Sequence, residues 1–160
     1  KVLGRELEFP ESIGFLLENP AFLDRYSGYS NLKLLAEIQN NISDAEIKEV
    51  LSLVGLNEEA SKKKYRKYSL GMKQRLGIAA AIMENPDIII LDEPTNALDT
   101  AGVKLVKGIL QKQKERGALC ILSCHDLPVL ESLSDEIIKL EEGKIIEHIS
   151  LSKAGGGTEF

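Results

Sequence analysis

Three short apolar runs alternate along the chain with longer segments whose apolar residues recur at helical spacing. The runs are SIGFLL at 12–17, DIIIL at 87–91 and ALCILS at 118–123. Apolar runs of this length, bounded by turn-forming residues, are typical of strands buried on both faces of a parallel sheet. Helical spacing is found at 31–39, 43–56, 71–86 and about 99–116. Strands that alternate with helices predict an α/β fold with a mostly parallel sheet.

The segment at 20–67 carries helical patterns only. Within it Ser43 and Glu46 have the spacing of a capping box, which marks the start of a helix, and Gly55 marks its end. We therefore expect a helical subdomain at 20–67, inserted between the first strand and the alanine-rich helix at 71–86.

The remaining residues divide into a core and a tail. We expect residues 1–19 and 68–152 to form the α/β core, which includes a helical turn at 126–134 and a hairpin at 135–148. Residues 153–160 read KAGGGTEF and have no core-forming pattern, so we expect a flexible tail there.

Composition and charge narrow the function classes. The chain has 160 residues, enough for one domain, with 28% charged and 43% hydrophobic residues, as in soluble globular proteins. Its net charge of -5 argues against nucleic acid as the main partner, because phosphate binders usually carry a basic face. No apolar run approaches the length of a membrane span. Cys120 and Cys124 lie too far apart on an extended segment to bridge each other, so we expect small buried thiols in a reducing compartment.

Two adjacent acids follow the second apolar run, at Asp92 and Glu93. Charges at the carboxyl end of a buried parallel strand lie where open α/β sheets bind ligands. Magnesium prefers oxygen ligands and keeps several waters, so Asp92 alone is a sufficient protein ligand for it. Because side chains alternate along an extended chain, we expect Glu93 to point away from the metal and to act on a water that attacks a phosphate. The simpler alternative is a solvated acidic pair that ends a core strand.

Two other segments carry candidate chemistry. His125 and Asp126 end the third apolar run, so in a parallel sheet His125 reaches the edge that carries Asp92 and can donate to a γ-phosphate oxygen; the alternative is a surface histidine. Ser69 and Gly71 precede a helix, whose first N–H groups form a ready anion site. The alternative for Ser69 is an N-cap without further function.

Four segments in this order, IGFLLE, YSLGMKQRL, IIILDEPTNALD and LSCHD, resemble the nucleotide-binding subunit of ATP-binding cassette (ABC) transporters, and more closely that of bacitracin-resistance and lantibiotic-immunity exporters. The resemblance covers nearly all of the chain before the tail. It implies a P-loop NTPase-like fold, ATP and Mg2+ as ligands, a second nucleotide-binding subunit and a transmembrane permease as partners, and a cytoplasmic location on the inner face of the membrane.

The resemblance also implies roles for single residues. Asp92 matches the magnesium ligand and Glu93 the catalytic glutamate, and His125 matches the histidine that senses the γ-phosphate. Residues 68–72, with Ser69 and Gly71, match the signature motif, which contacts ATP held by the opposite subunit. Asp99 ends the segment that runs along the dimer interface. Glu18 matches the glutamine that links the metal to the membrane partner.

The chain departs from the family pattern at three places. Leu70 and Met72 replace a glycine and a glutamine of the signature, and Glu18 replaces a glutamine, which adds a negative charge. No GxxxxGK followed by Ser or Thr, the loop that cradles phosphates, occurs in the sequence. The first methionine is Met72, so we expect the sequence to be part of a longer protein and to be inactive alone.

Two alternatives to an exporter ATPase remain. One is an ABC-type ATPase of chromosome maintenance or translation, although the gap of about 50 residues between the first strand and the signature leaves no room for a long coiled coil. The other is a binding domain that keeps the fold without catalysis, although such domains tend to lose the residues at Glu93 or His125.

Overall fold

The computed structural model describes residues 12–18, 20–39 and 41–151, and the chain divides into two compact units at 1–123 and 124–160. Each unit has its own sheet. The first contains three parallel strands in the order β1-β2-β3, and the second contains the antiparallel pair β4-β5.

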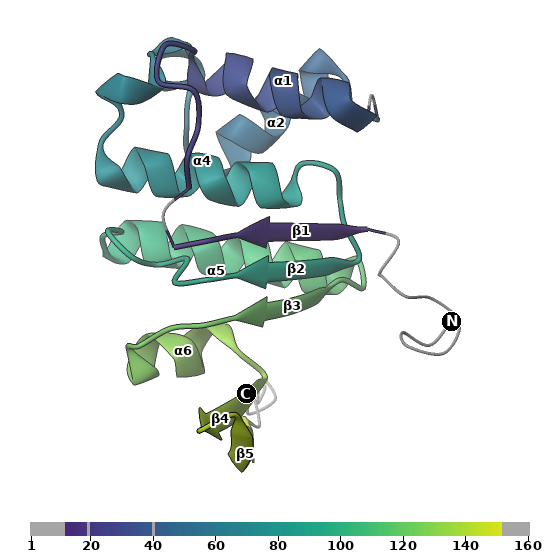
Figure 1. The fold of residues 1–160 in the computed structure, drawn as a ribbon, viewed down its shortest axis with the longest axis vertical. Helices are drawn as coiled ribbons and strands as arrows, with labels where there is room; N and C mark the ends of the chain where they lie inside the picture. The colour runs from purple at the N-terminus through teal and green to yellow at the C-terminus, as the bar shows by residue number, and fades with distance from the viewer. Residues whose placement is uncertain (1–11, 19, 40, 152–160) are drawn as a thin grey trace, which may run out of the picture. The chain divides into compact units, whose positions relative to one another are not determined.

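The elements of the first unit follow the predicted alternation of strands and helices (Figure 1). Its strands are β1 (Ile13–Leu16), β2 (Ile88–Leu91) and β3 (Leu119–Leu122). Its helices are α1 (Gly28–Gln39), α2 (Asp44–Leu53), α3 (Glu58–Lys62), the short 3-10 helix η1 (Tyr65–Lys67), α4 (Leu70–Ile82) and α5 (Thr100–Glu115). The prediction of an α/β fold with a parallel sheet is confirmed. Helix α1 begins three residues before the predicted start, because the Ser27 hydroxyl accepts a hydrogen bond from the Ser30 N–H at 3.0 Å.

The two faces of the three-stranded sheet differ in burial. Leu16 and its partner Leu91 are at most 2% exposed, as is Ile89. On the other face Phe15, Ile90 and Ile121 stand in register, and each is at least 38% exposed. The prediction that the run at 87–91 is buried on both faces is therefore wrong, because α4 packs against the face of Leu16 and Ile89, whereas Ile90 lies on the opposite face.

Helix α4 touches β1 at two glycines. A Cβ atom on Gly14 would lie 1.8 Å from the carbonyl oxygen of Ala81, and one on Gly77 would lie 2.5 Å from the Cδ1 atom of Leu16. Real Cβ atoms essentially never approach another atom this closely, and at Gly14 the facing atom is backbone, so only glycine permits the contact there. At Gly77 the facing atom is the end of the Leu16 side chain, which would have to move. The two glycines therefore allow α4 to lie close against β1.

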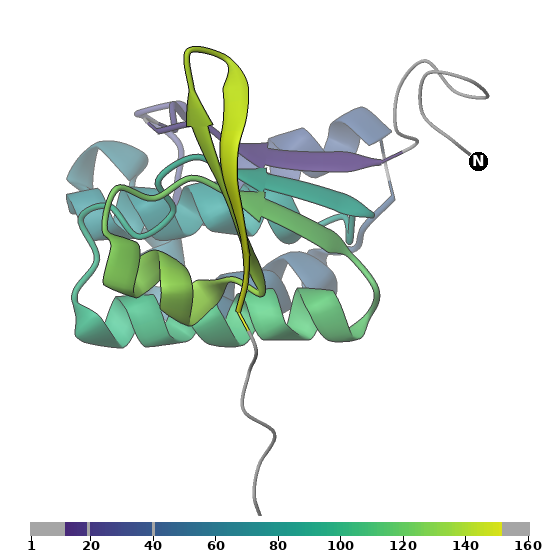
Figure 2. The same cartoon turned by 90° about the horizontal axis from the view of Figure 1, so that it is seen from below.

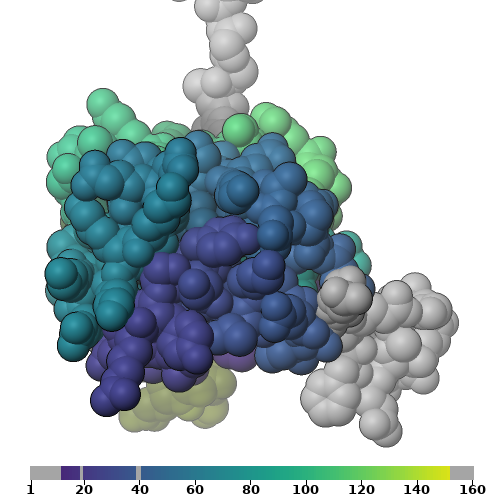
Figure 3. Space-filling view, turned by 90° about the horizontal axis from the view of Figure 1, so that it is seen from above, coloured from purple at the N-terminus to yellow at the C-terminus, as the bar shows by residue number. Residues whose placement is uncertain are grey.

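The segment at 20–67 packs on the side of α4 away from the sheet (Figure 1) and forms the face seen in Figure 3. Its described residues contain helices and one isolated bridge, as the sequence predicts. Its core comprises side chains at most 2% exposed: Leu32, Ile47, Leu51 and Val54. Within the basic run at 62–67, Tyr65 is buried, and its hydroxyl donates to the Pro20 carbonyl oxygen at 2.6 Å. This run is therefore an anchor for the segment as well as a solvated surface.

The second unit contains α6 (Leu127–Leu133) and a hairpin of β4 (Glu136–Glu141) and β5 (Lys144–Ser150), seen as the long yellow-green ribbon in Figure 2. The hairpin turn has positive φ at Glu142 and Gly143, 47° and 76°. Two consecutive residues with positive φ give the turn type that suits the right-handed twist of paired strands. The predicted hairpin is confirmed.

The cysteines are less buried than the sequence predicts. Cys120 and Cys124 are both partly buried, and neither forms a disulfide. Burial raises the pKa of the Cys120 thiol above its ordinary value, an effect that the positive charge of Arg116 opposes. Across the residues that the structure describes, every helix is too short or too polar to cross a membrane.

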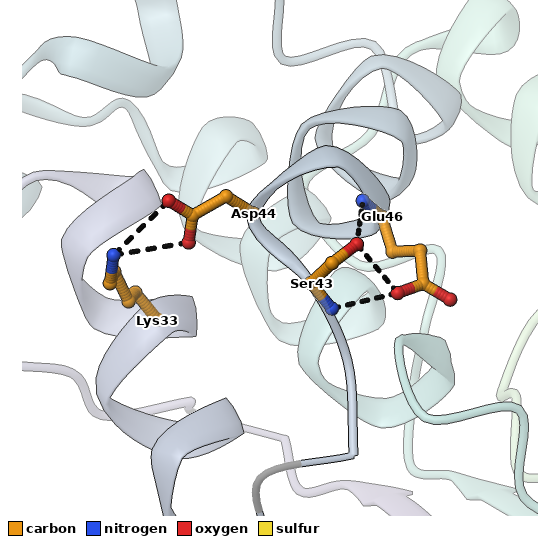
Figure 4. Close-up of polar contacts among 4 residues, drawn as sticks. All are labelled: Lys33, Ser43, Asp44 and Glu46. Atoms are coloured by element: carbon orange, nitrogen blue, oxygen red, sulfur yellow. Dashed lines mark hydrogen bonds and ion pairs between the residues drawn. The ribbon is translucent and has the colours of Figure 1, made fainter.

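The predicted capping box at the start of α2 is present (Figure 4). The Glu46 carboxylate accepts from the backbone N–H of Ser43 at 2.7 Å, and the Ser43 hydroxyl accepts from the Glu46 N–H at 3.3 Å. Beside it, the Asp44 carboxylate forms an ion pair with Lys33 at 3.1 Å. The hydrogen bond from the Ser43 backbone, and then that from its hydroxyl, lower the pKa of Glu46 below its ordinary value of 4.5.

We expect Ser43→Ala to lower the free energy of unfolding by about 1 kcal/mol at pH 7, because it removes the N-cap.

The Glu46 carboxylate has a lowered pKa in the folded state, so its contribution to the free energy of unfolding is complete above pH 4.5 and is lost as the pH falls through the lowered value. The difference between the unmodified chain and Glu46→Ala, measured by urea unfolding, should therefore shrink at low pH. Glu49→Ala, in the same helix but outside the box, is the control. A difference that grows on acidification would contradict the assignment.

Candidate functional site

The carboxyl ends of the three strands meet at one edge of the sheet. The Asp92 N–H donates to the carbonyl oxygen of Leu16 at 2.8 Å, and the Ser123 N–H donates to that of Leu91 at 3.0 Å. These hydrogen bonds extend the parallel ladder by one residue beyond the ends of β2 and β3 and place Asp92 beside Ser123. Polar residues that follow β2 and β3 therefore share this edge within the first unit.

Ser123 connects the two adjacent acids. Its hydroxyl donates to the Oδ1 atom of Asp92 at 2.5 Å and accepts a hydrogen bond from the Glu93 N–H at 3.1 Å. Asp92 and Glu93 are both partly buried. The donors available to a cation here are carboxylate and hydroxyl oxygens, which suit Mg2+.

The backbone at Glu93 differs from the sequence-based expectation. An extended chain would alternate the two acidic side chains, but Glu93 has a φ of 49°, in the left-handed region. Ala97 also has a positive φ, 60°, in the turn that follows. Left-handed residues other than glycine are strained and cluster at functional sites. The orientation of Glu93 is therefore set by this turn and not by strand alternation.

A side chain of α4 holds the same turn. Gln74 is 5% exposed, and its Nε2 atom donates to the backbone carbonyl oxygen of Glu93 at 2.8 Å. The sequence analysis missed both Gln74 and Ser123. The sequence gives a signal for Gln74, which is a polar residue next to the apolar face of an alanine-rich helix. It also gives one for Ser123, which ends an apolar run two residues before His125.

The start of α4 lies against the turn at 95–99. The Ser69 hydroxyl accepts from the Met72 N–H at 3.2 Å and is the N-cap of α4. A Cβ atom on Gly71 would lie 3.1 Å from the carbonyl oxygen of Ala97, so the two segments are in close contact. Asp99 is the N-cap of α5, and its Oδ1 atom accepts from the Gly102 N–H at 2.7 Å.

Ser69, Gly71 and Asp99 line one cavity of about 580 Å3. Arg75 lines it as well, and its Nη1 atom lies 3.5 Å from the Val54 carbonyl oxygen at the end of α2. The structure thus brings together three predicted binding residues from two segments. The Ser69 hydroxyl and the Asp99 carboxylate both serve as helix caps in this arrangement.

The two other predicted residues, Glu18 and His125, do not line this cavity. Glu18 is exposed, two residues beyond the end of β1. His125 is exposed and belongs to the second unit, where the next residue, Asp126, accepts from the Val129 N–H at 3.1 Å and is the N-cap of α6. Among the described residues no three His, Cys, Asp or Glu side chains gather to hold a metal ion. A Mg2+ ion bound at Asp92 would accordingly keep several waters.

Open α/β sheets form a class of proteins that bind ligands at the carboxyl ends of their strands, where this sheet carries Asp92 and Glu93. Residues 4–96 match the family model described as "ABC transporter". The chain therefore belongs to the ABC transporter family.

Curated relatives support this membership. The chain is 44% identical over 143 residues to the uncharacterized ABC transporter ATP-binding protein YybJ of Bacillus subtilis, covering 89% of this chain and 65% of that protein. It is 40% identical to the bacitracin transport ATP-binding protein BcrA of Enterococcus faecalis, covering 88% of this chain and 46% of that protein. The lantibiotic transport ATP-binding protein SrtF of Streptococcus pyogenes is 38% identical, with coverages of 92% and 62%. The chain thus spans only about half to two thirds of the length of these relatives.

The fold has a solved counterpart. The ATP-binding cassette MJ0796, in a dimeric post-hydrolysis state bound to ADP and Pi, superposes with a TM-score of 0.80 at 25% identity. The match covers 88% of this chain and 63% of that one. The predicted fold class, including the resemblance to P-loop NTPases of the ABC type, is confirmed.

Proposed function

We propose that the complete protein hydrolyses ATP as the nucleotide-binding subunit of an ABC exporter for a drug, peptide or lantibiotic-like substrate. The observation that carries the proposal is the pair Asp92 and Glu93 at the carboxyl edge of β2, in the same chain as Ser69 and Gly71 at the start of α4. The similarity to a bacitracin and a lantibiotic transport ATP-binding protein supports the exporter type.

The chemistry assigned to the edge is an attack of water on the γ-phosphate. Glu93 takes a proton from the water, whose oxygen forms a bond to phosphorus as the bond to ADP breaks, and His125 donates a hydrogen bond to the phosphate. A bound Mg2+ would neutralise phosphate charge, with Asp92 as its ligand and Glu18 as a second oxygen donor. General-base catalysis of this kind contributes about 10²- to 10⁴-fold to the rate.

We also propose that two nucleotide-binding subunits form the working unit, as identical or sister chains. Ser69 and Gly71 would face the γ-phosphate of ATP on the other subunit, because the first turn of a helix carries partial positive charge and N–H donors. Asp99 would lie along the interface. The dimeric state of the MJ0796 cassette is the support for this arrangement.

The membrane partner is assigned to an apolar cavity of about 460 Å3 in the first unit. It is lined by β1, by Pro20 and Phe22, by Leu35 and Ile38 of α1, and by α4. The Phe22 ring is partly buried, 5.4 Å from the ring of Tyr65, whereas Ile38 is 78% exposed. A short helix of a transmembrane permease could place its apolar face in such a groove. The complete protein would then lie on the inner face of the membrane, with 20–67 as a helical subdomain between the permease and the core formed by 1–19 and 68–152.

We expect Glu93→Gln in the complete protein to leave ATP binding within about twofold and to lower hydrolysis by about 10²-fold or more, because glutamine cannot accept the proton. Phosphate release and equilibrium ATP binding measure the two effects. Glu131→Gln, an exposed glutamate of α6, is the control. The 160-residue chain, whose sequence lacks the phosphate-cradling loop, should not turn over ATP. Retention of most of the activity by Glu93→Gln would remove Glu93 from its role.

We expect Gly71→Asp, added to the Glu93→Gln protein, to prevent ATP-dependent dimerisation without weakening ATP binding to the monomer. A carboxylate at this position would repel the γ-phosphate at the helix start. Gly71→Ala controls for crowding of the Ala97 carbonyl oxygen, and Gly108→Asp adds the same charge where a Cβ meets nothing within 4 Å. Sedimentation with and without ATP measures dimerisation, and unchanged dimers of Gly71→Asp would refute the assignment.

We expect Ile38→Asp in the complete protein to abolish binding to the permease while ATPase activity without the permease stays within about twofold. Ile38 is mostly exposed, so its replacement should not disturb the core, in contrast to Phe22→Asp, which would leave an unpaired charge beside Tyr65. Leu140→Asp, at an exposed leucine of β4, is the matched control. Co-purification with the permease is the measurement. Normal binding by Ile38→Asp would place the docking groove elsewhere.

A further inference from the structure

We propose that Gln74 and Ser123 are positioning residues that hold the peptide of Glu93 from its two ends and so aim its carboxylate. The inference rests on the proposed role of Glu93 as the base. It adds two side chains that contact neither the phosphate nor the attacking water in the proposed reaction.

Two side chains form hydrogen bonds with the backbone of Glu93. The N–H of Glu93 donates to the Ser123 hydroxyl at 3.1 Å, and its carbonyl oxygen accepts from Gln74 at 2.8 Å. Both partners are side chains, one from the residue after β3 and one from α4, so neither hydrogen bond belongs to the strand ladder. Because a hydroxyl has a single proton, the donation from Ser123 to Asp92 leaves its lone pairs to receive the Glu93 N–H. The orientation of the Ser123 hydroxyl is therefore fixed by both acids.

These hydrogen bonds hold Glu93 in a left-handed backbone conformation. Glu93 has a φ of 49°, which an L-residue keeps only where its surroundings impose it. It precedes Pro94, whose side chain is less than 2% exposed, and a residue before proline is restricted further. The two hydrogen bonds and the buried ring together determine the direction in which the Glu93 side chain leaves the turn.

Gln74 belongs to α4, the helix that also carries Gly71. Helix α4 begins at Leu70, and its first turn contains Gly71, so one rigid helix contacts both the proposed dimer site and the Glu93 carbonyl. A displacement of the start of α4 on contact with ATP of a second subunit would thereby change the position of the base. Gln74 thus couples the position of the Glu93 peptide to the start of α4.

The experiment compares variants of the complete protein at saturating Mg2+. We expect Gln74→Leu and Ser123→Ala each to lower kcat by about 10- to 100-fold, the usual effect of removing a partner that orients a reacting group, with KM for ATP within about twofold. Ser123→Thr keeps the hydroxyl and should retain activity. Gln113→Leu, at a glutamine of α5 that is 6% exposed, controls for the loss of a buried amide.

Two further measurements separate positioning from general destabilisation. On the Glu93→Gln background, Gln74→Leu should lower the residual rate no further, because Gln74 acts through Glu93 alone, whereas Ser123→Ala also removes the hydrogen bond to Asp92. Hydrogen exchange of the Glu93 amide should be faster in Ser123→Ala than in Ser123→Thr, whatever the activity.

The outcomes distinguish this inference from the proposed function. If Glu93→Gln lowers hydrolysis but Gln74→Leu and Ser123→Ala leave kcat unchanged, the positioning role is overturned and the function stands. If Glu93→Gln leaves hydrolysis intact, the function fails and the inference fails with it. Should Gln74→Leu not fold, the exchange of the Glu93 amide in Ser123→Ala against Ser123→Thr decides, because Ser123 is exposed and its loss spares the core.

Discussion

The contact between α4 and β1 is the constraint on which the rest of the first unit depends. Gly14 and Gly77 let the helix lie directly on the strand, with the Ala81 carbonyl oxygen against Gly14. That contact fixes the height of α4 above the sheet, and with it the reach of Gln74 to the turn after β2. The helices of 20–67 then pack on the outer side of α4, so their position relative to the strands is set through this one helix.

Helix caps and proposed ligand-binding groups coincide in the candidate site. Ser69 caps α4 and Asp99 caps α5, and both line the same cavity. Capping directs a side-chain oxygen to the backbone N–H groups at a helix start, which is also where an anion is stabilised. A structural and a binding role for Ser69 therefore require the same backbone geometry and do not exclude each other.

Much of this architecture could be predicted from the sequence, since strands, helices and the capping box depend on local periodicity. The parallel pairing of β1, β2 and β3 was predicted from their alternation with helices, whereas their order in the sheet was not. The left-handed backbone of Glu93 could not be predicted from the sequence, because it is held by hydrogen bonds to residues 19 and 30 positions away. The exposed row with Phe15 was also missed, because an apolar run does not reveal which of its faces a helix covers.

The strained turn after β2 has an evolutionary consequence. Glu93 and Ala97 both hold left-handed backbone conformations that cost an L-residue roughly 1–2 kcal/mol each. Glycine, and to a lesser degree asparagine, would adopt the same conformations at less cost. A descendant that did not depend on the proposed hydrolysis would therefore gain stability by replacing Glu93, and selection for stability would then oppose the return of the acid. Loss of the acid at this position would be easier to acquire than to reverse.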